Sequence, residues 1–138
     1  MPTFFDSTAD AAEASEALRG LAHASRGFDQ PAEMYGVIGD LSSGMRSLRQ
    51  ALDQIADVHE RKAAHAFNDD GSHEAGVRDA LAAAEELRQA AILVDRAYDR
   101  LAEGFIAAGR IAWRPDPATE EAAPSRWVSV VFLQGEEA

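Results

Sequence analysis

The chain has 138 residues, which is enough for one domain with its own core but not for two. It carries 24 acidic and 13 basic residues, for a formal net charge of −11, and it has no cysteine. The lack of cysteine excludes a disulfide framework and any thiolate metal or redox site. Because a surface with this excess of negative charge repels the phosphate backbone of nucleic acids, we expect no direct DNA or RNA binding.

The sequence gives no sign of membrane contact or export. The first ten residues, MPTFFDSTAD, lack the basic start and the apolar run of a secretory signal. No stretch approaches the roughly 20 apolar residues that cross a bilayer. We therefore expect a cytoplasmic protein.

A first helix is expected over residues 8–26. Ser7 followed by Asp10 has the pattern of a capping pair, and an alanine-rich segment follows it. The apolar face of this segment is weak, because Leu18 and Leu21 are its large apolar residues. Gly27 is expected to end the helix.

A second helix is expected from Pro31 to about Phe67, because proline suits the first turn of a helix. Apolar residues recur along it at alternating spacings of three and four, which places them in one seam on one side of the helix. This seam consists of Ile38, Leu41, Met45, Leu48, Leu52 and Ile55.

The third helix is the longest expected element. The polar segment 68–72 forms a turn, Ser72 is the N-cap, and the helix runs to about Ala108 with Gly109 as its C-cap. A short connection between two helices of similar length favours an antiparallel hairpin with coiled-coil packing. The seam of this third helix consists of Val77, Ala80, Ala84, Leu87, Ala91, Val94, Tyr98, Leu101, Phe105 and Ala108.

Two further patterns concern what covers this expected hairpin. The segment 90–94 is apolar on every side of the third helix, so one partner helix cannot cover both Ile92 and Leu93. We expect the first helix or a second copy of the chain to cover them, and a homo-oligomer in the second case. Small side chains on the second helix offer the first helix a place to pack closely, in a stripe formed by Gly36, Asp40, Ser43, Ser47 and Ala51.

The chain changes character after the third helix, so we expect a helical domain over residues 1–114. Residues 115–124, rich in proline, alanine and acidic residues, are expected to be a linker. Residues 125–138 contain a dense run of β-branched and aromatic side chains, which predicts a strand-like segment. The exposed edge of a lone strand needs a partner. We therefore expect interface residues at Trp127, Val128, Val130 and Phe132.

The turn between the second and third helices holds the best candidates for a metal site. Imidazole and carboxylate groups ligate zinc or harder cations. However, His59 and His65 lie six residues apart and do not share a helix face, and segment 68–74 lacks the ligand spacing of a calcium loop. We therefore expect neither a bound metal nor another cofactor. The weak candidates are His65, Asp69, Asp70 and His73.

No motif in the sequence favours catalysis. No serine lies in a nucleophile-elbow context. Glu13 and Glu16 form one Glu-x-x-Glu, half of the magnesium-binding pattern of helical nucleotide pyrophosphohydrolases, but the second helix lacks the Glu-x-x-Asp that would complete it. We therefore expect no catalytic residue. Three glycines of the second helix lack the context of a phosphate loop and are interpreted as packing glycines: Gly36, Gly39 and Gly44.

Three segments together resemble small helical proteins encoded on plasmids and integrated elements of actinobacteria. These segments are EALRGLAHASR from Glu16, the AGRIAW ending of residues 104–113, and RWVSVVFLQGE from Arg126. The resemblance implies no established activity. The leading hypothesis is a non-enzymatic, all-α interaction or scaffold protein of a mobile genetic element, which binds itself or a partner protein.

Two alternatives remain open at this stage. The expected hairpin is similar in length class to the type VII secreted helical hairpins, which would make the chain a secreted effector. However, the turn lacks their Trp-x-Gly motif, and no Tyr-x-x-x-Asp/Glu signal follows Tyr35 or Tyr98. The other alternative is a metal-dependent hydrolase that uses the histidines and carboxylates of the turn.

Overall fold

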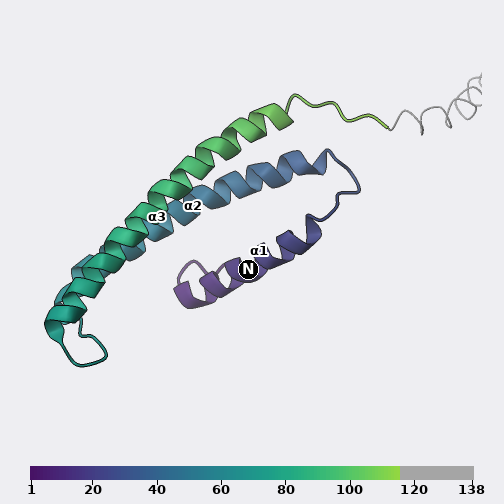
Figure 1. The fold of residues 1–138 in the computed structure, drawn as a ribbon. Helices are drawn as coiled ribbons and strands as arrows, with labels where there is room; N and C mark the ends of the chain where they lie inside the picture. Colours follow the sequence, from purple (N-terminus) through teal and green to yellow (C-terminus); the bar gives the residue numbers. More distant parts are fainter. Residues whose placement is uncertain (116–138) are drawn as a thin grey trace, which may run out of the picture.

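The computed structural model describes residues 1–115, and this part of the chain contains three α-helices and no strand (Figure 1). α1 spans Ser7–Ala24, α2 spans Glu33–Lys62, and α3 spans His73–Ala108. A single 3-10 turn, η1, covers Ala63–His65 directly after α2. The all-α prediction is confirmed for the described residues.

The described part ends at Pro115, so the rest of the expected linker 115–124 and the expected strand-like segment 125–138 lie outside it. Within residues 1–115, none of the helices combines the length and the apolar character that crossing a membrane requires.

The N-terminus of α1 is held by two carboxylates. Asp6 is the N-cap, and its Oδ1 accepts a hydrogen bond of 3.0 Å from the backbone N–H of Ala9. Asp10 accepts hydrogen bonds from the backbone N–H groups of Thr3 and Phe4, at 2.7 and 3.1 Å. The expected cap at Ser7 is therefore one residue late, because the preceding aspartate takes that role while residues 3–6 fold back over the first turn.

Acidification is expected to release this N-terminal structure. The backbone N–H of Thr3 is the main group that holds the pKa of the Asp10 carboxyl below its ordinary value. Because the folded-state pKa is lowered, the ionised Asp10 stabilises the folded N-terminus fully at a pH above the unfolded pKa of about 3.9. This stabilisation is lost as the pH falls through the folded-state pKa. In an NMR titration, the amide signals of Thr3 and Phe4 should move toward random-coil positions only at a pH below about 3.9.

Asp10→Asn is the control for this titration, because an amide cannot titrate in that range. The variant should lack the acid-induced shift at Thr3 and Phe4. A wild-type shift centred at the ordinary aspartate pKa, or one that persists in the variant, would contradict the assignment.

α2 and α3 lie side by side and run antiparallel (Figure 1). At one end of the pair, the rings of Tyr35 and Phe105 stack with their centroids 4.2 Å apart. Nearer the middle, Arg49 Nη1 lies 3.2 Å from Asp95 Oδ1. Residue numbers therefore rise along α2 as they fall along α3, as an antiparallel pair requires.

The fully buried hydrophobic positions of the α2–α3 pair are all alanines. In residues 1–115 the buried hydrophobic residues are Ala56, Ala63, Ala84 and Ala91, and no large side chain there is fully buried. Small facing side chains allow two helices to approach closely but bury little apolar area. The pair is therefore close-packed without having the hydrophobic core of a globular domain.

The seam expected on α3 faces α2 throughout, since each of its ten residues is buried or half-buried. The seam expected on α2 is wrong at Leu48 and Ile55, which are 44% and 46% exposed. At the corresponding steps the residues that face α3 are Arg49, which pairs with Asp95, and Ala56, which is 0% exposed. Leu48 and Ile55 each lie one position before the facing position, and alanine at position 56 lets α3 come close.

Gly76 makes the closest approach in the fold. An added Cβ at this buried position of α3 would lie 2.4 Å from the Cα and N atoms of Phe67. Gly39 is also in contact, since its Cβ would lie 3.1 Å from the Phe105 ring, whereas Gly36 and Gly44 would meet nothing within 4 Å. In the single chain, the interpretation as packing glycines therefore holds at Gly39 alone among those three.

α1 does not cover the pair. None of its Cα atoms comes within 8 Å of those of α2 or α3, and none of its residues is buried. The expectation that α1 packs on the stripe of small residues is therefore wrong for this chain. The physical reason is the weak apolar face of α1, where Leu18 is 58% exposed. All five residues of the stripe are exposed: Gly36, Asp40, Ser43, Ser47 and Ala51.

Candidate interaction surface

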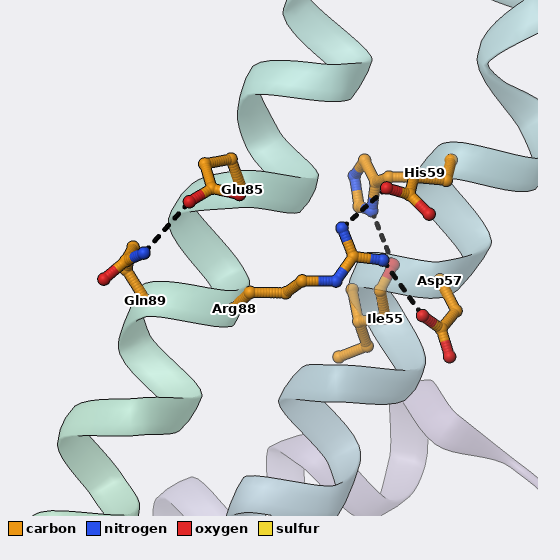
Figure 2. Close-up of polar contacts among 7 residues, drawn as sticks. Ile55, Asp57, His59, Glu85, Arg88 and Gln89 are labelled. Atoms are coloured by element: carbon orange, nitrogen blue, oxygen red, sulfur yellow. Dashed lines mark hydrogen bonds and ion pairs between the residues drawn. The ribbon is translucent and has the colours of Figure 1, made fainter.

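One side of the α2–α3 pair is polar, and two arginines, Arg49 and Arg88, join the helices there. Arg88 of α3 donates hydrogen bonds to Glu60 Oε1 at 2.7 Å and to Asp57 Oδ1 at 3.0 Å, both on α2 (Figure 2). These two carboxylates raise the pKa of the Arg88 guanidinium. Because the three side chains are partly exposed, solvent screens the pairs, and they fix the register of the helices more than they add stability.

An open groove follows the same side toward the far end of the pair. Arg49 in it pairs with Asp53 and Asp95, and Arg46 lies 5.8 Å from the centre of the Tyr98 ring. The groove therefore offers a phosphate group little net positive charge, because three aspartates line it beside the two arginines. The lining residues are Ser43, Arg46, Ser47, Arg49, Gln50, Asp53, Gln54, Asp95, Tyr98 and Asp99.

The opposite side of α2 carries a second heptad seam, which we call the outer seam. Its members recur at alternating spacings of three and four, and they lie about 110° around the helix from the residues that face α3. No member carries a charge. Leu48, Ile55 and Val58 in it are 44%, 46% and 37% exposed. The outer seam consists of Leu41, Gly44, Leu48, Ala51, Ile55 and Val58.

α3 extends this apolar side beyond the outer seam. Leu93, 61% exposed, and the half-buried Ala90 and Ala97 lie on the same side of the pair as the outer seam. We call the outer seam together with Ala90, Leu93 and Ala97 the apolar face. Since neither α1 nor any other described element covers it, this face is open to water.

The two interface candidates on α3 lie on different sides of the pair. Ile92 is four residues after Arg88 and three before Asp95, so it shares their polar side, where it is 43% exposed. Leu93 belongs to the apolar face. The interface role stays a prediction for both residues, and the other candidates, Trp127, Val128, Val130 and Phe132, lie outside the described residues.

The candidate metal ligands at the connection between α2 and α3 take part in turn structure. His73 Nδ1 donates to the carbonyl of Ala66 at 2.8 Å, and its ring lies 4.8 Å from that of Phe67. Asn68 Oδ1 accepts from the backbone N–H groups of Asp70 and Ser72, at 3.1 and 2.8 Å. Within residues 1–115, no three histidine or carboxylate side chains gather as a metal site would require.

His59, near the C-terminal end of α2, is hydrogen-bonded within its own helix. His59 Nδ1 donates to the carbonyl of Ile55, one turn earlier, at 2.8 Å (Figure 2). The structure thus does not bring His59, His65 and His73 to one point, and the metal-free state stays a prediction.

Sequence reasoning missed two parts of this arrangement. Arg88 binds Glu60 and Asp57, which lie 28 and 31 positions earlier in the sequence, and no local spacing signals such pairs. The outer seam was readable as a second heptad on α2, but Leu41, Leu48 and Ile55 were assigned to the contact with α3 instead. Comparison with protein-family models, curated proteins and solved structures finds no match to this chain.

Proposed function

We propose that this chain is a non-enzymatic interaction module that acts by presenting its apolar face to a protein surface. The observation that carries the proposal is the uneven use of large apolar side chains. No large side chain in residues 1–115 is fully buried, while Leu48, Ile55 and Leu93 are 44%, 46% and 61% exposed on one side. Covering the rest of each such side chain is worth about 1 kcal/mol, so the face is a site where association releases free energy.

The chemistry of the face suits the apolar stripe of another helix. A heptad seam with alternating large and small side chains accepts the side chains of a partner helix between its own. The outer seam carries no charged or hydrogen-bonding side chain that could bind a phosphate or a carboxylate. The polar side, in contrast, carries arginines that are paired within the chain.

The biological setting is proposed from the sequence alone. The three segments that resemble proteins of actinobacterial plasmids and integrated elements support a role in a mobile genetic element, and the composition supports a cytoplasmic location. The partner under this proposal is a protein, either a second copy or another chain.

A charge placed in the middle of the outer seam is expected to disable the module. Leu48→Glu puts a carboxylate where the proposal requires an apolar contact, and the free energy of burying it opposes any association there. Gln50→Glu adds the same charge about 200° around the helix, on the polar side, and is the matched control. The readouts are the mass in solution and the fluorescence of a dye that binds apolar surfaces.

The two readouts together cover both states of the face. If the face is covered in the purified protein, the wild type is larger than one chain and Leu48→Glu returns it to the mass of one chain. If the face is free, the wild type binds the dye and Leu48→Glu lowers the signal several-fold. Gln50→Glu should behave as wild type in both. A Leu48→Glu variant that matches wild type in mass and in dye binding would exclude the proposal.

A further inference from the structure

We propose that the partner is a second copy of this chain, and that the outer seams of two α2 helices pack antiparallel about a two-fold axis. This inference rests on the proposed function and names the occupant of the apolar face. In the resulting assembly two α2 helices form the centre and two α3 helices flank them, which gives a four-helix bundle.

The order of side chains along the outer seam is self-complementary. A two-fold axis between Leu48 and Ala51 would set each Leu48 against Ala51 of the second copy, and each Ile55 against Gly44 of the second copy. At the centre of the contact each large side chain then faces a small one, the arrangement that close helix packing requires, and at its ends Leu41 faces Val58 of the second copy. An added Cβ at Gly44 would meet nothing within 4 Å, so no contact among residues 1–115 accounts for a glycine there.

The distribution of charge also favours the outer seam as the contact between two copies. Two copies of a chain with a net charge of −11 repel each other, and a two-fold contact places each charged patch near its own duplicate. The polar side carries Asp53, Asp57 and Glu60, which makes it unfit for that contact. The outer seam carries no charge over its full length, so pairing through it keeps the carboxylates in water.

The size of the face matches what a stable dimer buries. α2 has 30 residues and α3 has 36, so the pair runs for about 45 Å and is about 18 Å wide. One such face covers about 800 Å², and two together cover about 1,600 Å², the usual size of a stable interface. The face is therefore large enough to hold two copies together.

Site-specific cross-linking tests the arrangement directly, because the natural chain has no cysteine. Ala51→Cys places one thiol close to the proposed axis, and Gln50→Cys places one on the polar groove, about 100° further around the helix. Both positions are exposed. With a short bis-maleimide, the full-length Ala51→Cys protein should form a covalent dimer at least 10-fold faster than Gln50→Cys, and adding Leu48→Glu should abolish the product.

A second variant separates dimer contact from the stability of the single chain. Gly44→Leu favours helix formation in α2 but fills the space proposed for Ile55 of the second copy. It should weaken the dimer by about 10-fold or more while leaving the helical content at or above that of wild type. Sedimentation of the full chain provides the mass, which should be twice 14.8 kDa in wild type at micromolar concentration.

Three results would overturn the self-pairing: a wild-type mass of one chain at high micromolar concentration, equal cross-linking of Ala51→Cys and Gln50→Cys, or a Gly44→Leu dimer as tight as wild type. The first of these leaves the proposed function standing if the wild-type monomer binds the dye and Leu48→Glu lowers the signal. In that case the apolar face binds a different protein and not a second copy of this chain. A monomer without dye binding would remove both proposals.

Discussion

Gly76→Ala is expected to lower the free energy of unfolding by about 3 kcal/mol. The new Cβ would lie 2.4 Å from the Cα and N atoms of Phe67, and these are backbone atoms that cannot rotate away. Relief requires the connection between η1 and α3 to move. Urea unfolding followed by circular dichroism measures the loss.

Gly104→Ala is the matched control, because it makes the same chemical change in the same helix. A Cβ at Gly104 would meet nothing within 4 Å. The control should therefore raise stability by about 0.5 to 1 kcal/mol, the usual gain when alanine replaces glycine inside a helix. Equal stability changes in the two variants would contradict the packing of α3 against residues 66–67.

Ala84→Leu is expected to cost about 2 to 3 kcal/mol, because the larger side chain must push α2 and α3 apart. Ala84 is 1% exposed, and the contact between the two helices depends on small side chains at its centre. The same unfolding measurement reports the loss. A lower far-ultraviolet signal is not expected before the transition, since leucine forms helix nearly as well as alanine does.

The control for this variant is Ala82→Leu, two residues earlier on the exposed surface of α3. It should change stability by less than about 0.5 kcal/mol, as surface substitutions usually do. If Ala84→Leu proves as stable as Ala82→Leu, or more stable than wild type, the alanine contact between α2 and α3 is not the one that holds the pair.

The sequence was sufficient to predict the helical class and the turn at Ser72, because these depend on local chemistry. Ser72 is the N-cap of α3, and its Oγ accepts from the backbone N–H of Ala75 at 3.2 Å, as its place after a polar turn predicts. The end of α3 at Ala108 followed from Gly109 in the same way. The start of α2 was less well predicted: Pro31 lies in a turn, and the helix begins at Glu33.

The face of α2 that meets α3 was only partly predictable, because hydrophobic periodicity cannot rank two seams on one helix. Ile38, Met45 and Leu52 lie toward α3 as expected and are half-buried. Leu48 and Ile55 belong to the outer seam instead, since alanine at position 56 allows the closer approach. A rule that assigns the largest apolar residues to the nearest partner fails where small residues make the contact.

The placement of Gly76 and of α1 had no signal in the sequence. Gly76 is required by a backbone ten residues earlier at Ala66, and nothing in the local pattern of α3 marks it. α1 was expected to pack on the small-residue stripe of α2, and α1 or a second copy was expected to cover the apolar segment 90–94 of α3. The weak apolar face of α1 accounts for its lack of contact with either helix.

The most direct test of the apolar face is hydroxyl-radical labelling of Leu48 and Leu81 in the full chain at increasing protein concentration, read by mass spectrometry. The two leucines are 44% and 47% exposed in the single chain, so they start as a matched pair on opposite sides of the α2–α3 pair. The account predicts that Leu48 becomes protected several-fold as the protein associates while Leu81 is labelled at a constant rate. Equal labelling of Leu48 and Leu81 at every concentration would contradict the pairing of two copies through the apolar face.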